Sequence, residues 1–206
     1  MKTRDFLRRY AYIYLYVAAF FLGCAGLMRQ AVETAGEMQA ISIHPVIIID
    51  AGHGGIDGGA TSCTGVPESK LNLDIAVRLN DLMRLLGYNT KMIRTTDTSI
   101  YTEGNTIAAQ KVSDLKERVR IVNETENGIL ISIHQNTFPE GRYSGAQVFY
   151  ADDTISREKA MYLQNAMITY LNPDSKRQCK SSDGIFLMQH IDKPGVLIEC
   201  GFLTNP

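Results

Sequence analysis

Three short runs of consecutive apolar residues stand out from the alternating pattern of the rest of the chain. They span residues 46–51 (VIIIDA), 128–134 (GILISIH) and 195–201 (GVLIECG). Their length and their β-branched residues are typical of strands that are buried on both faces, as in a parallel sheet. Each run carries a polar residue at or just beyond its end, where open α/β sheets place their ligands.

Helical patterns separate these runs. Apolar residues recur at helical spacing from Leu71 through Ile75, Leu79, Leu82 and Leu86, and Gly87 ends the pattern. Two further amphipathic patterns predict helices, and three apolar stretches predict additional strands. The predicted helices cover 114–122 and 155–171, the additional strands cover 88–94, 145–151 and 184–188, and the polar segment 95–110 is expected to be a surface loop. The pattern predicts a single α/β domain with a mostly parallel central sheet flanked by helices.

The N-terminal region has a different composition. Residues 1–9 are basic, residues 10–28 lack charge, and residues 29–45 show no clear periodicity. A basic segment before an apolar run of this length predicts a cytoplasmic N-terminus and a transmembrane signal anchor, with residues 29–45 as a linker to an extracytoplasmic domain over 46–206. Secretion after cleavage near Ala31 or Ala35 is the alternative.

Overall charge and cysteine spacing narrow the classes of function. The net charge is −1 and the four cysteines show no zinc-finger spacing. Such a balance does not indicate a nucleic-acid partner. Free thiols are the simpler interpretation of Cys63, Cys179 and Cys200, since Cys24 falls in the N-terminal apolar run. The glycine-rich loop at 52–59 has neither the P-loop nor the GxGxxG form, so no nucleotide cofactor is expected.

Four residues at the ends of predicted elements suggest chemistry. His53 follows the first buried strand, His134 ends the second, and Glu68 opens the first helix. The ends of parallel strands meet at one sheet edge, and two imidazoles with a carboxylate suit a zinc site that keeps an open position. Glu199 lies within the last apolar run. Burying a carboxylate is costly, so a glutamate at this position indicates a function, such as acting beside a metal-bound water.

Simpler interpretations exist for several polar residues. An acidic residue such as Glu68 is also favoured at a helix N-terminus by the dipole. His44 and His190 are expected to be loop residues without a ligand role, and Arg118 is expected to be a solvated charge on its helix.

Four segments in the same order resemble the zinc-dependent N-acetylmuramoyl-L-alanine amidases of the amidase 3 type. They are residues 49–60 (IDAGHGGIDGGA), Glu68 with its helix, residues 132–136 (SIHQN) and residues 197–205 (LIECGFLTN). The resemblance runs from Val46 to the C-terminus. It implies that His53, Glu68 and His134 hold Zn²⁺ and that Glu199 is the catalytic carboxylate.

The resemblance also implies a substrate and a setting. The substrate would be peptidoglycan, cut at the amide bond between N-acetylmuramic acid and L-alanine. Short anchored chains with a segment like 111–119 (KVSDLKERV) resemble the sporulation amidase that prepares the spore cortex, and an activating protein partner is conceivable. Gln135 departs from the family pattern, and relatives usually continue beyond the position of Pro206, so a C-terminally truncated catalytic domain is an expectation.

Three alternative functions are also compatible with the sequence. A zinc peptidase acting on wall peptides would use a similar ligand set. A cysteine hydrolase would use Cys200 with a neighbouring histidine. A non-catalytic peptidoglycan-binding protein would bind the wall without releasing product.

Overall fold

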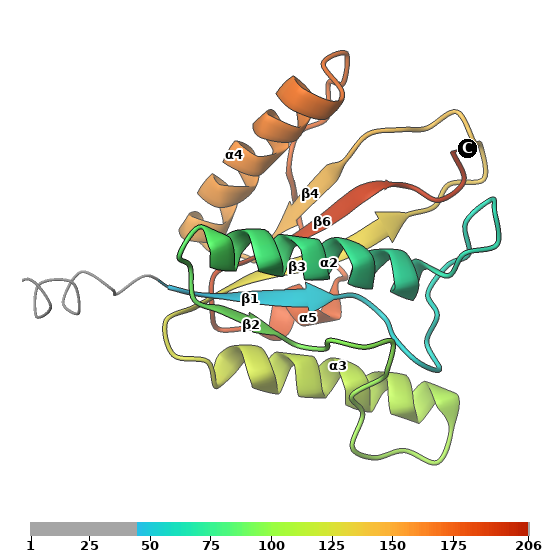
Figure 1. Ribbon diagram of the computed structural model, residues 1–206, viewed down its shortest axis with the longest axis vertical. Coiled ribbons are helices and arrows are strands. Elements are labelled where there is room, and N and C mark those ends of the chain that lie inside the picture. The colour runs from blue at the N-terminus through green and yellow to red at the C-terminus, as the bar shows by residue number, and fades with distance from the viewer. Residues whose placement is uncertain (1–44, 206) are drawn as a thin grey trace, which may run out of the picture. The chain divides into compact units, whose positions relative to one another are not determined.

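The computed structural model describes residues 45–205, in which helices cover a central sheet (Figure 1). The predicted cytoplasmic segment, anchor and nearly all of the linker lie outside the described residues. Within 45–205, no helix has the length and apolar character needed to cross a membrane. The elements, in chain order, are β1 (Val46–Ala51), α2 (Glu68–Leu85), β2 (Thr90–Met92), α3 (Ile107–Asn123), β3 (Gly128–Asn136), β4 (Gln147–Tyr150), α4 (Thr154–Leu171), β5 (Lys180–Ser181), α5 (Phe186–His190) and β6 (Gly195–Phe202).

The central sheet has the strand order β2-β1-β3-β6-β4-β5. Every pair is parallel except β4 with β6. The prediction of a mostly parallel sheet is therefore confirmed, with one antiparallel junction that makes the sheet mixed. The three apolar runs of the sequence are β1, β3 and β6, which lie side by side in parallel. Their carboxyl ends consequently meet at one edge, and the polar residues beyond them are brought together.

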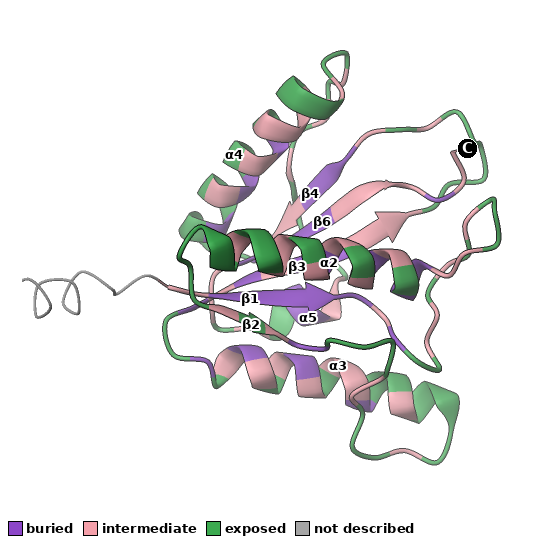
Figure 2. Ribbon diagram, in the orientation of Figure 1, coloured by how far each residue is buried: buried purple, intermediate pink, exposed green. Residues whose placement is uncertain are grey.

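Each face of the sheet is covered by helices, which gives three layers (Figure 1). Alternate residues of β1 separate the two cores: Ile47 and Ile49 face one core, and Ile48 faces the other. Ala76 of α2 and Ala160 of α4 belong to the first core. The second core contains Val122 of α3 and Leu187 and Met188 of α5. Figure 2 shows the burial concentrated along the strands and the inward faces of the helices.

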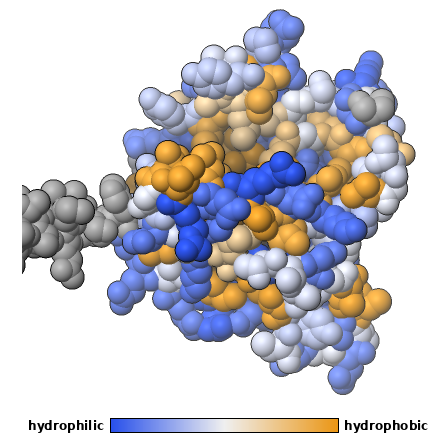
Figure 3. All heavy atoms as spheres, in the orientation of Figure 1, coloured by the Kyte–Doolittle hydropathy of each residue, from blue (hydrophilic) through white to orange (hydrophobic). Residues whose placement is uncertain are grey.

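The predicted apolar face of α2 is confirmed only in part. Ile75 and Leu79 pack against the first core. Leu82 and Leu86 are exposed, together with Leu85. Figure 3 shows a hydrophobic cluster over this end of the helix. The apolar residues at the end of α2 therefore do not join the core, so periodicity alone overestimated the buried stripe.

Three other predictions need correction. Residues 184–188 were expected to form a strand, but Phe186–His190 form the short helix α5. A short apolar stretch does not distinguish a strand from one buried helical turn. The predicted loop 95–110 ends early, because Thr106 caps α3 by accepting a hydrogen bond from the Ala109 amide. The two-residue strand β5 was not predicted, and the strand expected over 88–94 is reduced to Thr90–Met92.

Candidate metal centre and active site

His53 lies in the loop that leaves β1, with a positive φ of 61° that non-glycine residues seldom adopt. Two buried arginines hold the backbone there. Arg94 donates to the carbonyl oxygens of Ala51 (2.8 Å) and Gly52 (3.0 Å). Arg118 donates to those of Ala51 (3.0 Å) and His53 (2.8 Å). Three consecutive carbonyl groups are thus fixed by charged donors, which maintains the strained conformation of His53.

Arg118 is not the solvated charge that the sequence predicts. It is 2% exposed and forms a buried ion pair with Asp50 of β1. Its Nε also donates to Asp114 at 2.6 Å. The prediction was wrong because Asp50 lies 68 residues away along the chain and helix periodicity carries no information about it.

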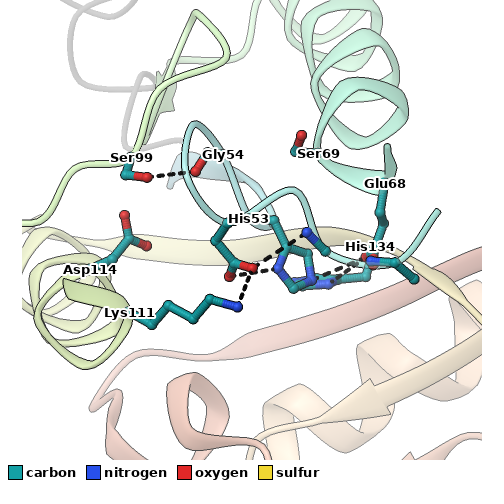
Figure 4. A network of polar contacts seen from close by, with 12 residues as sticks. His53, Gly54, Glu68, Ser69, Ser99, Lys111, Asp114 and His134 are labelled. Carbon is teal, nitrogen blue, oxygen red and sulfur yellow. Dashed lines mark hydrogen bonds and ion pairs between the residues drawn. The ribbon is translucent and has the colours of Figure 1, made fainter. Parts of the chain in front are cut away.

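Glu68 is the first residue of α2 and is 4% exposed. Its Oε2 accepts a hydrogen bond from the Ala60 amide at 3.1 Å. Its Oε1 accepts hydrogen bonds from the buried Asn72 side chain at 3.1 Å and from the Gln135 amide at 3.2 Å. A glutamate that only complements a helix dipole would face solvent. Glu68 instead points into the protein, toward both histidines (Figure 4).

His134 approaches from β3 and completes the group. Its Nδ1 lies 3.1 Å from Oε1 of Glu68, and Nε2 of His53 lies 3.4 Å from the same oxygen. The two imidazole rings are edge to face with centroids 5.0 Å apart. One ligand atom from each of the three residues lies within 4.8 Å of the others, a group that could hold a metal ion. The sequence prediction that these three side chains converge is confirmed.

Gly52 makes room for this arrangement. A Cβ atom at this position would come within 2.2 Å of the His134 ring. No such contact is sterically possible, so the loop after β1 and the end of β3 can approach each other only because residue 52 is a glycine.

The charges within the group are mutually stabilising. Burial opposes ionisation of Glu68, but hydrogen bonds from His134 and His53 outweigh it and hold the pKa of this carboxyl far below its usual range. Burial likewise opposes protonation of His53, but Glu68 and Asp57 raise the pKa of its imidazole. An ionised carboxylate beside two imidazole rings offers a cation one charged oxygen ligand together with nitrogen ligands.

Glu199 lies opposite His134 in the parallel pairing of β3 with β6. Burial, and secondarily the Glu68 charge, raise the pKa of its carboxyl, although the two histidines act in the opposite direction. Its Oε2 atom is buried and has no hydrogen-bond partner in the described part of the chain. This carboxyl group therefore stands beside the His–Glu–His group without a structural partner of its own.

The remaining candidates lie apart from this group or are unsuited to it. His190 is exposed, but it ends α5 and does not lie in a loop as predicted; its Nδ1 lies 2.8 Å from the Phe186 carbonyl oxygen. Cys63, Cys179 and Cys200 are free, as predicted. Burial raises the pKa of the Cys200 thiol to about 11, which keeps it protonated and weakens the cysteine-hydrolase alternative.

Sequence reasoning missed Asn72 and Asp57, which contact the ligand candidates Glu68 and His53. Asn72 follows Glu68 by one helical turn. That spacing is the only sequence signal that could have indicated the contact between the two side chains.

A cavity of about 300 Å³ opens beside His53 and His134. Asp57 and Lys111 lie on its polar side, and Phe186 of α5 belongs to its apolar wall. The cavity therefore gives a substrate space directly beside two of the three residues that could hold a metal ion.

Residues 47–206 match the protein-family model described as N-acetylmuramoyl-L-alanine amidase. The chain belongs to this amidase family. Its activity is that of an N-acetylmuramoyl-L-alanine amidase, a hydrolase of peptidoglycan.

Named relatives agree with this assignment. The amidase is 40% identical over 163 residues to the germination-specific N-acetylmuramoyl-L-alanine amidase of Bacillus subtilis, covering 78% of this chain and 68% of that protein. The CwlD amidase from Clostridioides difficile, solved in complex with the GerS lipoprotein, superposes with a TM-score of 0.74 and 36% identity, covering 79% of this chain and 84% of that one. An N-acetylmuramoyl-L-alanine amidase from Clostridium difficile 630 gives a TM-score of 0.64 and 31% identity, covering 79% and 82%.

Proposed function

We propose that the amidase uses Zn²⁺ held by His53, Glu68 and His134, with Glu199 as its catalytic carboxylate. The observation that carries this proposal is the position of Glu199. Its unpartnered carboxyl group pairs in register with His134, beside three side chains whose ligand atoms lie within 4.8 Å of one another.

The donor set suits zinc. Two imidazole nitrogens and one carboxylate oxygen, with a position left open, are the ligands of many catalytic zinc sites. When bound, the ion supplies Lewis-acid polarisation of the amide carbonyl and lowers the pKa of the attacking water. Glu68 is held in place by Asn72 and the Gln135 amide, so its carboxylate keeps its orientation during the reaction.

Glu199 would move the proton. An amide resists hydrolysis because water is a weak nucleophile and the amine is a poor leaving group. The Glu199 carboxylate accepts a proton from the attacking water and passes it to the departing nitrogen of L-alanine. Burial raises the pKa of Glu199, which brings its proton affinity closer to what this transfer in both directions requires.

The biological setting is inferred from the relatives. The germination-specific relative supports a role on spore cortex peptidoglycan. The lipoprotein complex of the CwlD relative supports a protein partner for this amidase, for which an activating role is part of the proposal. The basic and apolar segments of residues 1–28 support a membrane anchor with the catalytic domain on the extracytoplasmic side of the bacterial envelope. Zinc peptidase activity and wall binding without catalysis are the competing functions.

Mass spectrometry of muropeptides incubated with the full chain separates these possibilities. Free stem peptides that begin at L-alanine should appear, disappear with a zinc chelator and return when zinc is added. Peptide fragments cut elsewhere in the stem would indicate a peptidase, and intact muropeptides bound to the protein would indicate a binding role.

A Cys200→Ala variant tests the thiol alternative in the same assay. The Cys200 thiol is protonated and takes no part in the proposed mechanism, and a substitution to alanine leaves the β6 backbone in place. The variant should therefore release stem peptide within about twofold of the wild-type rate. Two results together would reject the zinc mechanism in favour of a cysteine hydrolase: loss of turnover in this variant, and wild-type activity that resists the chelator.

A further inference from the structure

The ring of His53 is contacted on both of its nitrogen atoms. Nε2 faces Glu68 at 3.4 Å, and Nδ1 lies 2.9 Å from Oδ2 of Asp57. A neutral imidazole donates from one nitrogen and accepts at the other. If Nε2 is to bind a metal ion, the ring must keep its proton on Nδ1, and the Asp57 carboxylate lies where it can accept that hydrogen bond. Nε2, on the side of the ring that faces Glu68, is then the nitrogen left for a metal ion.

Asp57 is itself held by a residue from a distant part of the chain. The ammonium group of Lys111 lies 2.7 Å from Oδ1 of Asp57, and the Gly59 amide donates to the same oxygen at 3.4 Å. Lys111 belongs to α3 and extends toward the loop that carries His53 (Figure 4). Lys111 and the Gly59 amide both contact Oδ1 of Asp57, so Oδ2 is left for His53.

We propose that Asp57, held by Lys111, is the positioning residue of the metal centre and fixes the His53 ring in its metal-binding tautomer. This inference rests on the proposed function, because it assumes that His53 is a metal ligand. Outer carboxylates that accept a hydrogen bond from a ligating imidazole orient the ring and increase its basicity.

The geometry favours this role over an ordinary surface ion pair. The side chains of Lys111 and Asp57 are 46% and 26% exposed, and an isolated pair of that kind contributes little to stability. The ring of His53 also lies close to the Gly59 backbone, because a Cβ atom at Gly59 would come within 2.8 Å of its Cδ2. The interaction with Asp57 therefore selects a ring orientation and a tautomer, and its effect should appear in metal binding.

Zinc affinity of the full chain, measured by competition with a chromophoric chelator, is the first test. Asp57→Asn should weaken zinc binding about 10- to 100-fold, the range typical of outer-shell substitutions. Lys111→Met should weaken it about threefold to tenfold. Lys116→Met is the matched control, because it removes the same charge from an exposed position of the same helix. It should leave the zinc affinity unchanged.

The double variant shows whether Lys111 acts through Asp57. If it does, Asp57→Asn combined with Lys111→Met should bind zinc no more weakly than Asp57→Asn alone. Independent, multiplying losses would overturn the linkage. Wild-type zinc affinity in Asp57→Asn would overturn the inference and leave the zinc site itself intact. A wild-type chain that binds no zinc would reject the proposed function and, with it, this inference.

A metal-free measurement adds a readout that a purely structural role would not change. Imidazole ¹⁵N shifts, recorded at a pH where the ring is neutral, should show His53 with its proton on Nδ1. In Asp57→Asn the resonances should move toward a mixture of tautomers, whereas Lys116→Met should match wild type. A His53 ring protonated on Nε2 in the wild-type chain would overturn the proposal.

Discussion

Two carboxylates on the strands that flank β3 differ in how completely they are paired. Asp50 of β1 is 1% exposed, and both of its oxygens are bonded, one to Arg118 and the other to the Ser132 hydroxyl at 2.6 Å. Glu199 of β6 is partly buried, and its buried Oε2 has no partner among residues 45–205. Both positions lie toward the carboxyl ends of parallel strands, so their difference is one of surroundings.

The pKa values move in opposite directions for that reason. Burial alone would raise the pKa of Asp50, but the Arg118 guanidinium and the Ser132 hydroxyl lower it. Burial raises the pKa of Glu199, and the net effect of its neighbours does not reverse that shift. A paired buried carboxylate supports the structure, whereas an unpaired one keeps its proton affinity available for chemistry.

Substitution of the unpaired carboxylate should give the largest effect. Glu199→Gln removes the proton acceptor while preserving the size of the side chain. We expect turnover of muropeptides to fall by about 10³- to 10⁴-fold, toward the upper end of general acid–base contributions. Zinc affinity should stay within about threefold of wild type. Turnover near the wild-type rate would remove Glu199 from the catalytic role.

Substitution in the paired site should affect folding. Arg118→Met leaves Asp50 buried without its cation and also removes the donors to the Ala51 and His53 carbonyls. The free energy of unfolding in urea should fall by about 3–5 kcal/mol, as expected when one partner of a buried ion pair is removed.

A double variant serves as the control for that measurement. Asp50→Asn combined with Arg118→Met should recover part of the lost stability, because no unpaired charge remains in the interior. A loss of less than about 1 kcal/mol in the single variant would show that the ion pair is not needed for folding.

The smallest effects should appear in the pH dependence of stability of the metal-free protein. The pKa of Asp50 is lowered from 3.8, so its contribution is present above that value and is lost as the pH falls through the folded-state pKa. The pKa of Glu199 is raised from 4.5, so stability is fully present below that value and is lost as the pH rises through the folded-state pKa.

Urea unfolding of wild type, Asp50→Asn and Glu199→Gln between about pH 3 and pH 7 would test both signs. Relative to wild type, Asp50→Asn should lose stability as the pH rises toward 3.8. Glu199→Gln should gain stability as the pH rises above 4.5. Differences of the same sign for both variants would contradict the contrast between the two sites.

Much of the fold was predictable because the buried parallel strands are continuous apolar runs. β1, β3 and β6 are visible in the sequence, and their parallel arrangement brings His53, His134 and Glu199 to one sheet edge. Local pattern was less informative for α5 and β5. A five-residue helix and a two-residue strand are too short for periodicity to identify, and tertiary packing determines them.

The supporting residues of the site were less predictable than the ligands. Arg94 donates to the carbonyls of Gly52 and Ser69 and so connects the loop that carries His53 with the first turn of α2, which carries Glu68. Neither this contact nor that of Arg118 with Asp50 has a signature in the local sequence, because each joins segments far apart in the chain. The exposed end of α2 was also not predictable, since periodicity does not show which apolar residues of a helix pack against the sheet.

The arginine-held loop also affects how the amidase would gain and lose its metal. The carbonyls of residues 51–53 are fixed by protein donors alone, so the backbone beside His53 is ordered without an ion. Zinc binding at the proposed site would then cost the backbone little conformational entropy. Small zinc domains differ, because they fold only around their metal. Treatment with a chelator should yield a folded, dormant protein that is reactivated by adding zinc without refolding.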